Sequence, residues 1–243
     1  MTVKKQKGSM HVKQWKVLAL TAVMALSLCA CGEKTTPAST AATQSTATRQ
    51  SGAAEAFDME QVKAEIDSMT VSDFSESAEP TDYVKLRVKD FGEIVLRLRP
   101  DLAPISAQNF KDLVAAGFYS GTLFHRVYPG FMIQGGAGTE ELPAIKGEFS
   151  ANGVNNPLLH IRGVLSMART DVMDSATSQF FLTHADAPSL DGKYAAFGYI
   201  VAGLDTVDRI CEIELASNPY SGERSVPMVE VKIESAVFVS PNK

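Results

Sequence analysis

Apolar and polar residues alternate over residues 82–98, which is the pattern of β-strands. Every second position is apolar over 84–88 and again over 94–98, and the turn sequence Asp90-Phe91-Gly92 lies between these two runs. Side chains of one parity share one face of a strand. The pattern therefore predicts a hairpin with one buried face.

The spacing of apolar residues becomes helical after residue 103. Pro104 suits the first turn of a helix, and Phe110, Leu113 and Val114 then recur on one helical face. Gly117 follows the last of them and is typical of a helix end. We therefore predict a helix from residue 104 to about residue 116 that buries one side.

The remainder of the chain is a series of short apolar runs separated by Gly, Pro and Asn. A second helical pattern lies near 204–212, and a last strand pattern covers 229–239. No repeat of fixed period is present. Mostly strands with two helices predicts a closed or nearly closed β structure.

A weaker helical pattern precedes this β region, over residues 57–74. Asp58 is a suitable N-cap with Gln61 three places later, and apolar residues recur on one face at Met59, Val62, Ile66 and Met69. We predict a short helical lead-in over 57–79, ahead of a main domain over 80–240. Whether the lead-in packs on that domain is left open by its sequence.

The first thirty residues have the composition of a secretory signal peptide. Five lysines and no acidic residue lie in 1–16, followed by an apolar run over 17–30. This run is too short for a transmembrane helix, which needs about 20 apolar residues, and suits the core of a signal peptide. Met10 is a possible alternative start, because a basic stub and the apolar run would both remain.

The apolar run ends in Leu28-Cys29-Ala30-Cys31-Gly32, which resembles a bacterial lipobox. The small residue before Cys31 and the Leu three places before it fit that motif, so we expect lipid on Cys31. A plain secretory signal cut near Ala30 is the alternative. Buried acyl chains contribute about 0.8 kcal/mol per CH₂ group, so a lipidated Cys31 would anchor the protein to the outer face of the cell membrane.

Residues 31–56 predict a disordered tether between this anchor and the domain. The stretch is rich in Thr, Ser, Ala and Gln and has almost no large apolar side chain. Such a segment buries too little apolar surface to offset the entropy lost on ordering. Together with the signal peptide and the lipid on Cys31, this tether predicts an extracytoplasmic location.

The net charge of the chain without its signal peptide narrows the range of binding partners. Without residues 1–30 the chain keeps 18 of its 23 basic side chains against 28 acidic ones, a formal charge of −10. Such a charge disfavours nucleic acid, and we expect no nucleic-acid partner and a monomer.

Only Cys211 remains for the folded domain, so no disulfide can form there. Cys211 shares a helical stripe with Leu204 and Val207, which predicts core packing.

The motifs of common hydrolases and metalloenzymes are absent from the sequence. It contains no G-x-S-x-G, P-loop, H-E-x-x-H or C-x-x-C pattern. The four histidines, which include His125, His160 and His184, are not at metal-ligand spacing. We expect neither a metal nor a cofactor.

The segments after residue 123 bring polar and aromatic side chains together in an unusual combination. The stretch FHRVYPGFMIQGG over 124–136 places a guanidinium, aromatics, a thioether and an amide in one strand-like region. Arg126, Met132 and Gln134 have the same parity there and can face the same side. The stretches GVLSMA over 163–168, SQFF over 178–181 and LDGKYAAFG over 190–198 follow.

In order and approximate spacing these segments resemble the cyclophilin family of peptidyl-prolyl cis-trans isomerases, over residues 82–240. The resemblance implies an eight-stranded closed antiparallel barrel capped by two helices. It also implies acceleration of rotation about Xaa-Pro bonds, with proline-containing segments of secreted or surface proteins as substrates. A catalytically weak peptide-binding or chaperone module that uses the same groove is the main alternative, and a solute-binding lipoprotein is a weaker one.

The resemblance also implies residue roles. Arg126 would be the catalytic arginine, and Gln134 would orient it and the substrate. The backbone of Ala168 and Arg169 would bind the peptide. The remaining expected substrate-binding side chains are His125, Phe131, Met132, Phe181, Leu190 and Tyr194.

The chain differs from the best-known family members at three positions in or beside the expected groove. Ser189 stands where Trp is common, Tyr194 where His is common, and Arg169 where Asn is common. Because Ser189 removes an aromatic wall, we expect weak cyclosporin binding. The loop over 137–147 is shorter and poorer in glycine than usual, which alters the rim of the groove.

Overall fold

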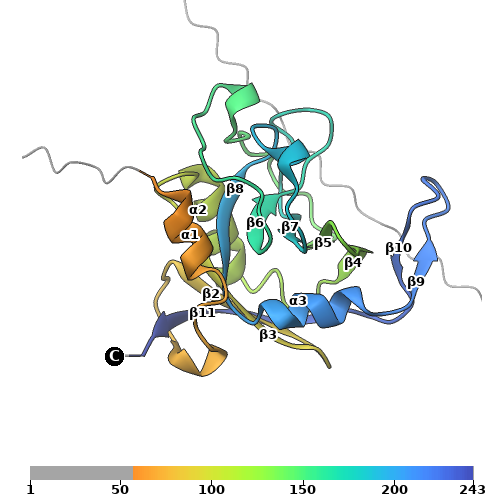
Figure 1. Cartoon of the computed structure of the whole chain (residues 1–243), viewed down its shortest axis with the longest axis horizontal. Helices are drawn as coiled ribbons and strands as arrows, with labels where there is room; N and C mark the ends of the chain where they lie inside the picture. Colours follow the sequence, from red (N-terminus) through yellow and green to blue (C-terminus); the bar gives the residue numbers. More distant parts are fainter. Residues whose placement is uncertain (1–56, 243) are drawn as a thin grey trace, which may run out of the picture. The chain divides into compact units, whose positions relative to one another are not determined.

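The computed structural model describes residues 57–242 (Figure 1). The expected signal peptide, Cys31 lipidation site and tether lie outside the described residues. The described part holds three α-helices, which are α1 (Met59–Glu65), α2 (Pro104–Ala115) and α3 (Leu204–Cys211). Single 3₁₀ turns lie at Val71–Asp73, Ser150–Asn152 and Pro188–Leu190.

Nine strands form one antiparallel sheet in the order β1-β11-β2-β3-β8-β6-β7-β5-β4. The alternating segment expected to be a hairpin forms β2 and β3, which pair in register from Tyr83↔Arg97 to Val88↔Gly92. β9 (Leu215–Ser217) and β10 (Arg224–Pro227) form a separate hairpin. The strands of the main sheet are β1 (Phe74–Glu76), β2 (Tyr83–Val88), β3 (Gly92–Leu98), β4 (Phe124–Tyr128), β5 (Met132–Gly135), β6 (Val164–Met167), β7 (Phe180–Thr183), β8 (Ala196–Ala202) and β11 (Ile233–Pro241).

The prediction of a closed eight-stranded barrel is wrong in detail. The mostly β class is confirmed, but the sheet has nine strands, and its outer strands β1 and β4 do not pair. On the edge of β11 away from β2, β1 covers the carboxyl end, and a single bridge joins Leu123 to Lys232 near the amino end. One bridge is too short to form a ladder, so the sheet curls without closing.

The core fills the inside of this curled sheet. Helix α2 inserts Phe110, whose ring lies 4.9 Å from that of Tyr119 and 5.4 Å from those of Phe180 and Phe197. Helix α3 buries Val207 and Ile210 in the same cluster. Cys211 joins them, which confirms its predicted core position, and burial raises the pKa of its thiol to about 12.

The lead-in packs on the domain. Helix α1 is shorter than the predicted pattern, and the Asp58 carboxylate caps it by accepting from the Glu60 amide at 2.8 Å. Val62 is buried in a second apolar cluster together with residues of β3, β6 and β8. Glu65 accepts from the Tyr199 hydroxyl at 2.5 Å and pairs with Arg97. These contacts attach the lead-in to the outer face of the sheet.

Candidate active site

A bulge in β4 brings the candidate catalytic arginine to the surface. Phe124 pairs with Gly135 and Arg126 with Gln134, so the register shifts by one residue at His125. Phe124 and Val127 can therefore both face the core, while Arg126 lies on the outer face. Such a bulge re-aims side chains without breaking the strand pair.

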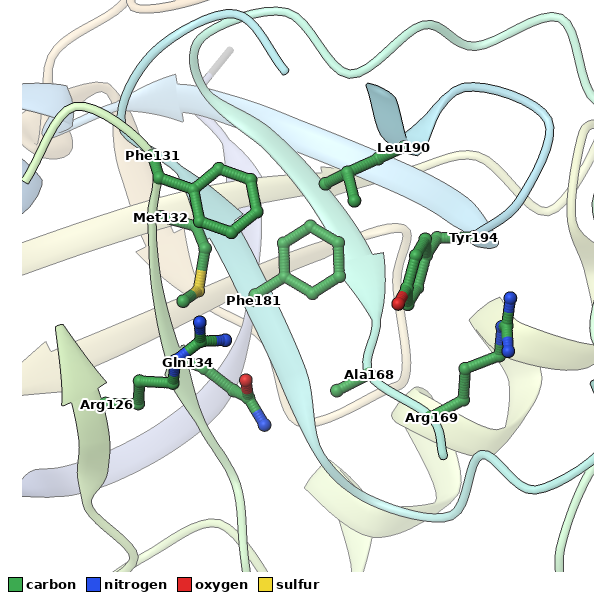
Figure 2. Close-up of a pocket in the computed structure, with 9 residues that line it drawn as sticks. All are labelled: Arg126, Phe131, Met132, Gln134, Ala168, Arg169, Phe181, Leu190 and Tyr194. Atoms are coloured by element: carbon green, nitrogen blue, oxygen red, sulfur yellow. The ribbon is translucent and has the colours of Figure 1, made fainter. Parts of the chain in front are cut away.

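Nine residues from four neighbouring segments line a pocket of about 260 Å³ on that outer face. In Figure 2, Arg126 and Gln134 lie next to each other, and Phe181 lies between Phe131, Leu190 and Tyr194. The pocket combines apolar side chains with two arginines, Arg126 and Arg169, and one amide, that of Gln134. The lining residues are Arg126, Phe131, Met132, Gln134, Ala168, Arg169, Phe181, Leu190 and Tyr194.

Nine of the ten residues expected at a substrate groove thus line one pocket. The exception is His125, which is the extra residue of the bulge and is solvent-exposed outside the pocket lining. The parity argument for Arg126, Met132 and Gln134 holds in space, because β4 and β5 pair directly. The bulge that separates His125 from them is a feature that strand periodicity does not reveal.

The apolar part of the pocket rests on a buried polar network. Met132 and Phe181 are only 2% and 4% exposed. The ring of His160 stacks behind Phe181 at 5.9 Å and 19°. His160 contacts Asp191 through Nδ1 and Ser166 through Nε2, both at 3.0 Å, and burial lowers the pKa of the ring. A neutral His160 that donates to Asp191 and accepts from Ser166 satisfies all three groups.

The polar edge of the pocket is arranged differently from the expectation. Gln134 Nε2 donates to Gln179 Oε1 at 2.9 Å, and among the hydrogen bonds of the described residues none joins Gln134 to Arg126. The guanidinium is held by Glu223: Nε and Nη2 donate to the two carboxylate oxygens, each at 2.7 Å. This ion pair raises the pKa of Arg126 and holds the pKa of Glu223 below its ordinary value.

The opposite wall is fixed by Arg169. Its guanidinium carbon lies 4.6 Å from the ring centre of Tyr194 and 5.0 Å from that of Phe149. Nε and Nη2 also donate to the Lys193 carbonyl, at 3.0 and 2.8 Å. The Ala168 amide donates to the Gln179 carbonyl at 2.9 Å and is therefore already used. The Arg169 side chain thus holds the Tyr194 wall in place, a role beyond the backbone contact expected of this residue.

Sequence reasoning missed three contributors to the site, Glu223, Gln179 and His160. Gln179 lies in the SQFF segment, close to the expected site residue Phe181, so its polar side chain could have indicated a place in the site. His160 and Glu223 had no such signal, because His160 lies in a loop 31 residues from Asp191 and Glu223 lies on a hairpin 97 residues from Arg126.

The described part of the chain shows no grouping of His, Cys, Asp and Glu side chains that could hold a metal ion. A search of the same residues for a helix long and apolar enough to cross a membrane finds none.

Comparison with known proteins identifies the family. Residues 83–237 match the family model described as cyclophilin type peptidyl-prolyl cis-trans isomerase/CLD. The chain is 42% identical over 160 residues to peptidyl-prolyl cis-trans isomerase A of Dickeya dadantii, an alignment that covers 61% of this chain and 80% of the relative. It is 41% identical over 156 residues to peptidyl-prolyl cis-trans isomerase B of Escherichia coli, covering 59% and 92%.

A solved structure gives the same result. A cyclophilin type peptidyl-prolyl cis-trans isomerase of Cryptosporidium parvum, crystallised in the presence of the dipeptide Ala-Pro, matches with a TM-score of 0.56 and 27% identity. The match covers 65% of this chain and 99% of that structure. The chain belongs to the cyclophilin-type peptidyl-prolyl cis-trans isomerases, which confirms the family and the enzyme class predicted from the sequence.

Proposed function

We propose that this isomerase binds a proline ring against Phe131, Met132 and Phe181 and accelerates rotation with a hydrogen bond from Arg126. The observation that carries the proposal is that these four side chains, from β4, β5, β7 and the turn that precedes β5, line one pocket (Figure 2). The Cryptosporidium relative crystallised with Ala-Pro supports a proline-containing ligand.

The chemistry required is modest. Conjugation between nitrogen and carbonyl is lost when the peptide bond twists. This loss gives the bond a rotational barrier of about 18–20 kcal/mol. The twisted bond has a pyramidal, basic nitrogen, and a donor that reaches it stabilises the transition state more than either ground state. Arginine suits this role because it remains charged and its planar fork offers several donors. The apolar pocket holds the ring while the carbonyl side rotates.

The first test measures turnover and affinity together. An NMR exchange experiment on a peptide with one Xaa-Pro bond gives the isomerisation rate, and titration of the same peptide gives its dissociation constant. Faster exchange on addition of a small fraction of enzyme is the expected result. Binding without faster exchange would instead favour the chaperone module that uses the same groove.

We predict that kcat/KM is nearly independent of pH between about 6 and 9, because no group in the mechanism titrates there. The Glu223 carboxylate raises the pKa of Arg126, so the guanidinium stays charged throughout. The pKa of Glu223 is lowered, so the ion pair is complete above the ordinary glutamate range and is lost only as pH falls through the lowered value. Partial desolvation and the nearby Arg126 lower the pKa of His125, so a step in the profile below about pH 6.5, the ordinary value for histidine, would implicate His125 instead.

The proposed place of action is the outer face of the cell membrane, through lipid on Cys31, where the enzyme would assist folding of secreted or surface proteins. The sequence Leu28-Cys29-Ala30-Cys31 and the polar stretch after it support this location. We expect the full-length chain to fractionate with membranes and to incorporate labelled palmitate. Cys31→Ser should abolish both, whereas Cys29→Ser should keep the label. Label that persists in Cys31→Ser would contradict the assignment.

A further inference from the structure

The carboxylate of Glu223 reaches the candidate catalytic arginine from a separate element. Glu223 lies on the hairpin of β9 and β10, which Figure 1 shows beside β4. Both partners are partly shielded from solvent, with side-chain exposures of 35% for Arg126 and 23% for Glu223. Among the hydrogen bonds of the described residues, those of the Arg126 guanidinium go to this carboxylate.

The geometry of the pair leaves the productive edge of the guanidinium free. Glu223 accepts from Nε and Nη2, which lie on one edge of the planar group. The guanidinium has five N–H donors, so Nη1 and the second hydrogen of Nη2 are not used by Glu223. A bidentate pair fixes the plane of the group as well as its position. The plane is thus set on one edge while the other edge can donate to a substrate.

The hairpin holds the carboxylate in an ordered place. The Asn218 amide donates to the Glu223 carbonyl at 2.7 Å, and the Gly222 amide donates to the Asn218 carbonyl at 2.8 Å. Asn218 Oδ1 accepts from the Tyr220 amide at 2.9 Å. Gly222 has a φ of 73°, which suits glycine in this tight turn. These hydrogen bonds hold the backbone of Glu223 in a defined turn, which limits the positions that its carboxylate can take.

We propose that Glu223 is the positioning residue of this isomerase, and that it takes the orienting role expected of Gln134. This inference rests on the proposed function, because it acts through Arg126. A free arginine side chain samples many rotamers, and the pair selects the one that lines the pocket. The negative charge of the carboxylate also weakens the positive field of the guanidinium. This loss acts against the gain that comes from orienting the donor. The substrate nitrogen is neutral and needs a directed donor, so orientation outweighs the lost field.

The test compares Glu223→Gln and Glu223→Ala with Glu230→Gln. Glu230 is an exposed carboxylate downstream of β10, so its variant makes the same charge change away from the pocket. We expect both Glu223 variants to lower kcat about tenfold, which corresponds to about 1.4 kcal/mol, with the peptide dissociation constant changed less than about threefold. Glu230→Gln should match the wild type.

A double-mutant cycle separates positioning from a merely structural role. In an Arg126→Ala background Glu223→Gln should have almost no further effect on the rate, because its only route of action is gone. Rates of Glu223→Gln equal to or above those of the control variant would overturn the inference, and so would an equal loss in both backgrounds. If Arg126→Ala itself keeps full turnover, the proposed function fails first. If Arg126→Ala is slow and Glu223→Gln is normal, only the positioning role fails.

Discussion

Arg126→Ala is expected to lower kcat/KM for Xaa-Pro isomerisation by about 100-fold, which is typical of removing one preorganised donor to a transition state. The guanidinium lies at the edge of the pocket formed with Phe131, Met132 and Phe181. Alanine removes the donor and leaves the apolar part of the pocket in place. Peptide affinity should therefore change much less than turnover. NMR exchange rates at several peptide concentrations measure both quantities.

The fold of this variant should remain intact. The Arg126–Glu223 pair is partly exposed, and such pairs contribute about 0–1 kcal/mol to stability. Arg87→Ala is the matched control, because Arg87 is an exposed arginine paired with Glu93 on the neighbouring strand, away from the pocket. Turnover of Arg126→Ala equal to that of Arg87→Ala would contradict the mechanism.

Glu148→Ala is expected to lower the free energy of unfolding by about 3 kcal/mol, because it leaves buried donors without partners. Glu148 is 2% exposed. Its carboxylate accepts from the amides of Ile105 and Ser106 at 3.0 and 2.7 Å, and from the Ser106 hydroxyl at 2.7 Å. These groups form the first turn of α2, whose N-cap residue Ala103 has no capping side chain. Urea unfolding followed by circular dichroism measures the change.

The control for this variant is Glu141→Ala, an exposed carboxylate in the same long loop. A surface change of this kind should shift stability by no more than about 0.5 kcal/mol. Glu148→Ala that unfolds like Glu141→Ala would show that α2 does not need the carboxylate. At temperatures where Glu148→Ala is still folded, its isomerase rate should be normal, because the pocket lies on other elements.

Local pattern was sufficient for most individual elements. Alternation over 84–98 predicted β2 and β3, and helical spacing predicted α2 and α3 to within about two residues. The strand β1 was not predicted, since Phe74–Glu76 is too short to show a period. The unclosed sheet was not predicted either, because closure depends on how β11 divides its outer edge between β1 and Leu123.

The pocket was largely predicted because its residues lie in a few long, distinctive segments. Paired strands bring those segments together, so Arg126, Met132 and Gln134 meet where their parity suggested, and Phe181 joins them from β7. His125, which the resemblance places beside the proline pocket, lies outside the pocket lining. A bulge moves one residue out of register, and neither composition nor alternation marks which residue it is.

The sequence by itself determined the family, the enzyme class, the main strands and helices, and most of the residues that line the candidate pocket. These depend on residues near one another in the chain, where spacing and motif are informative. The tertiary structure decided which carboxylate pairs with the guanidinium of Arg126 and which carboxylate caps α2. Glu223 lies 97 residues from Arg126 and Glu148 lies 42 from Ser106. A lone glutamate has no periodic pattern, so only the path of the folded chain shows which donor it meets.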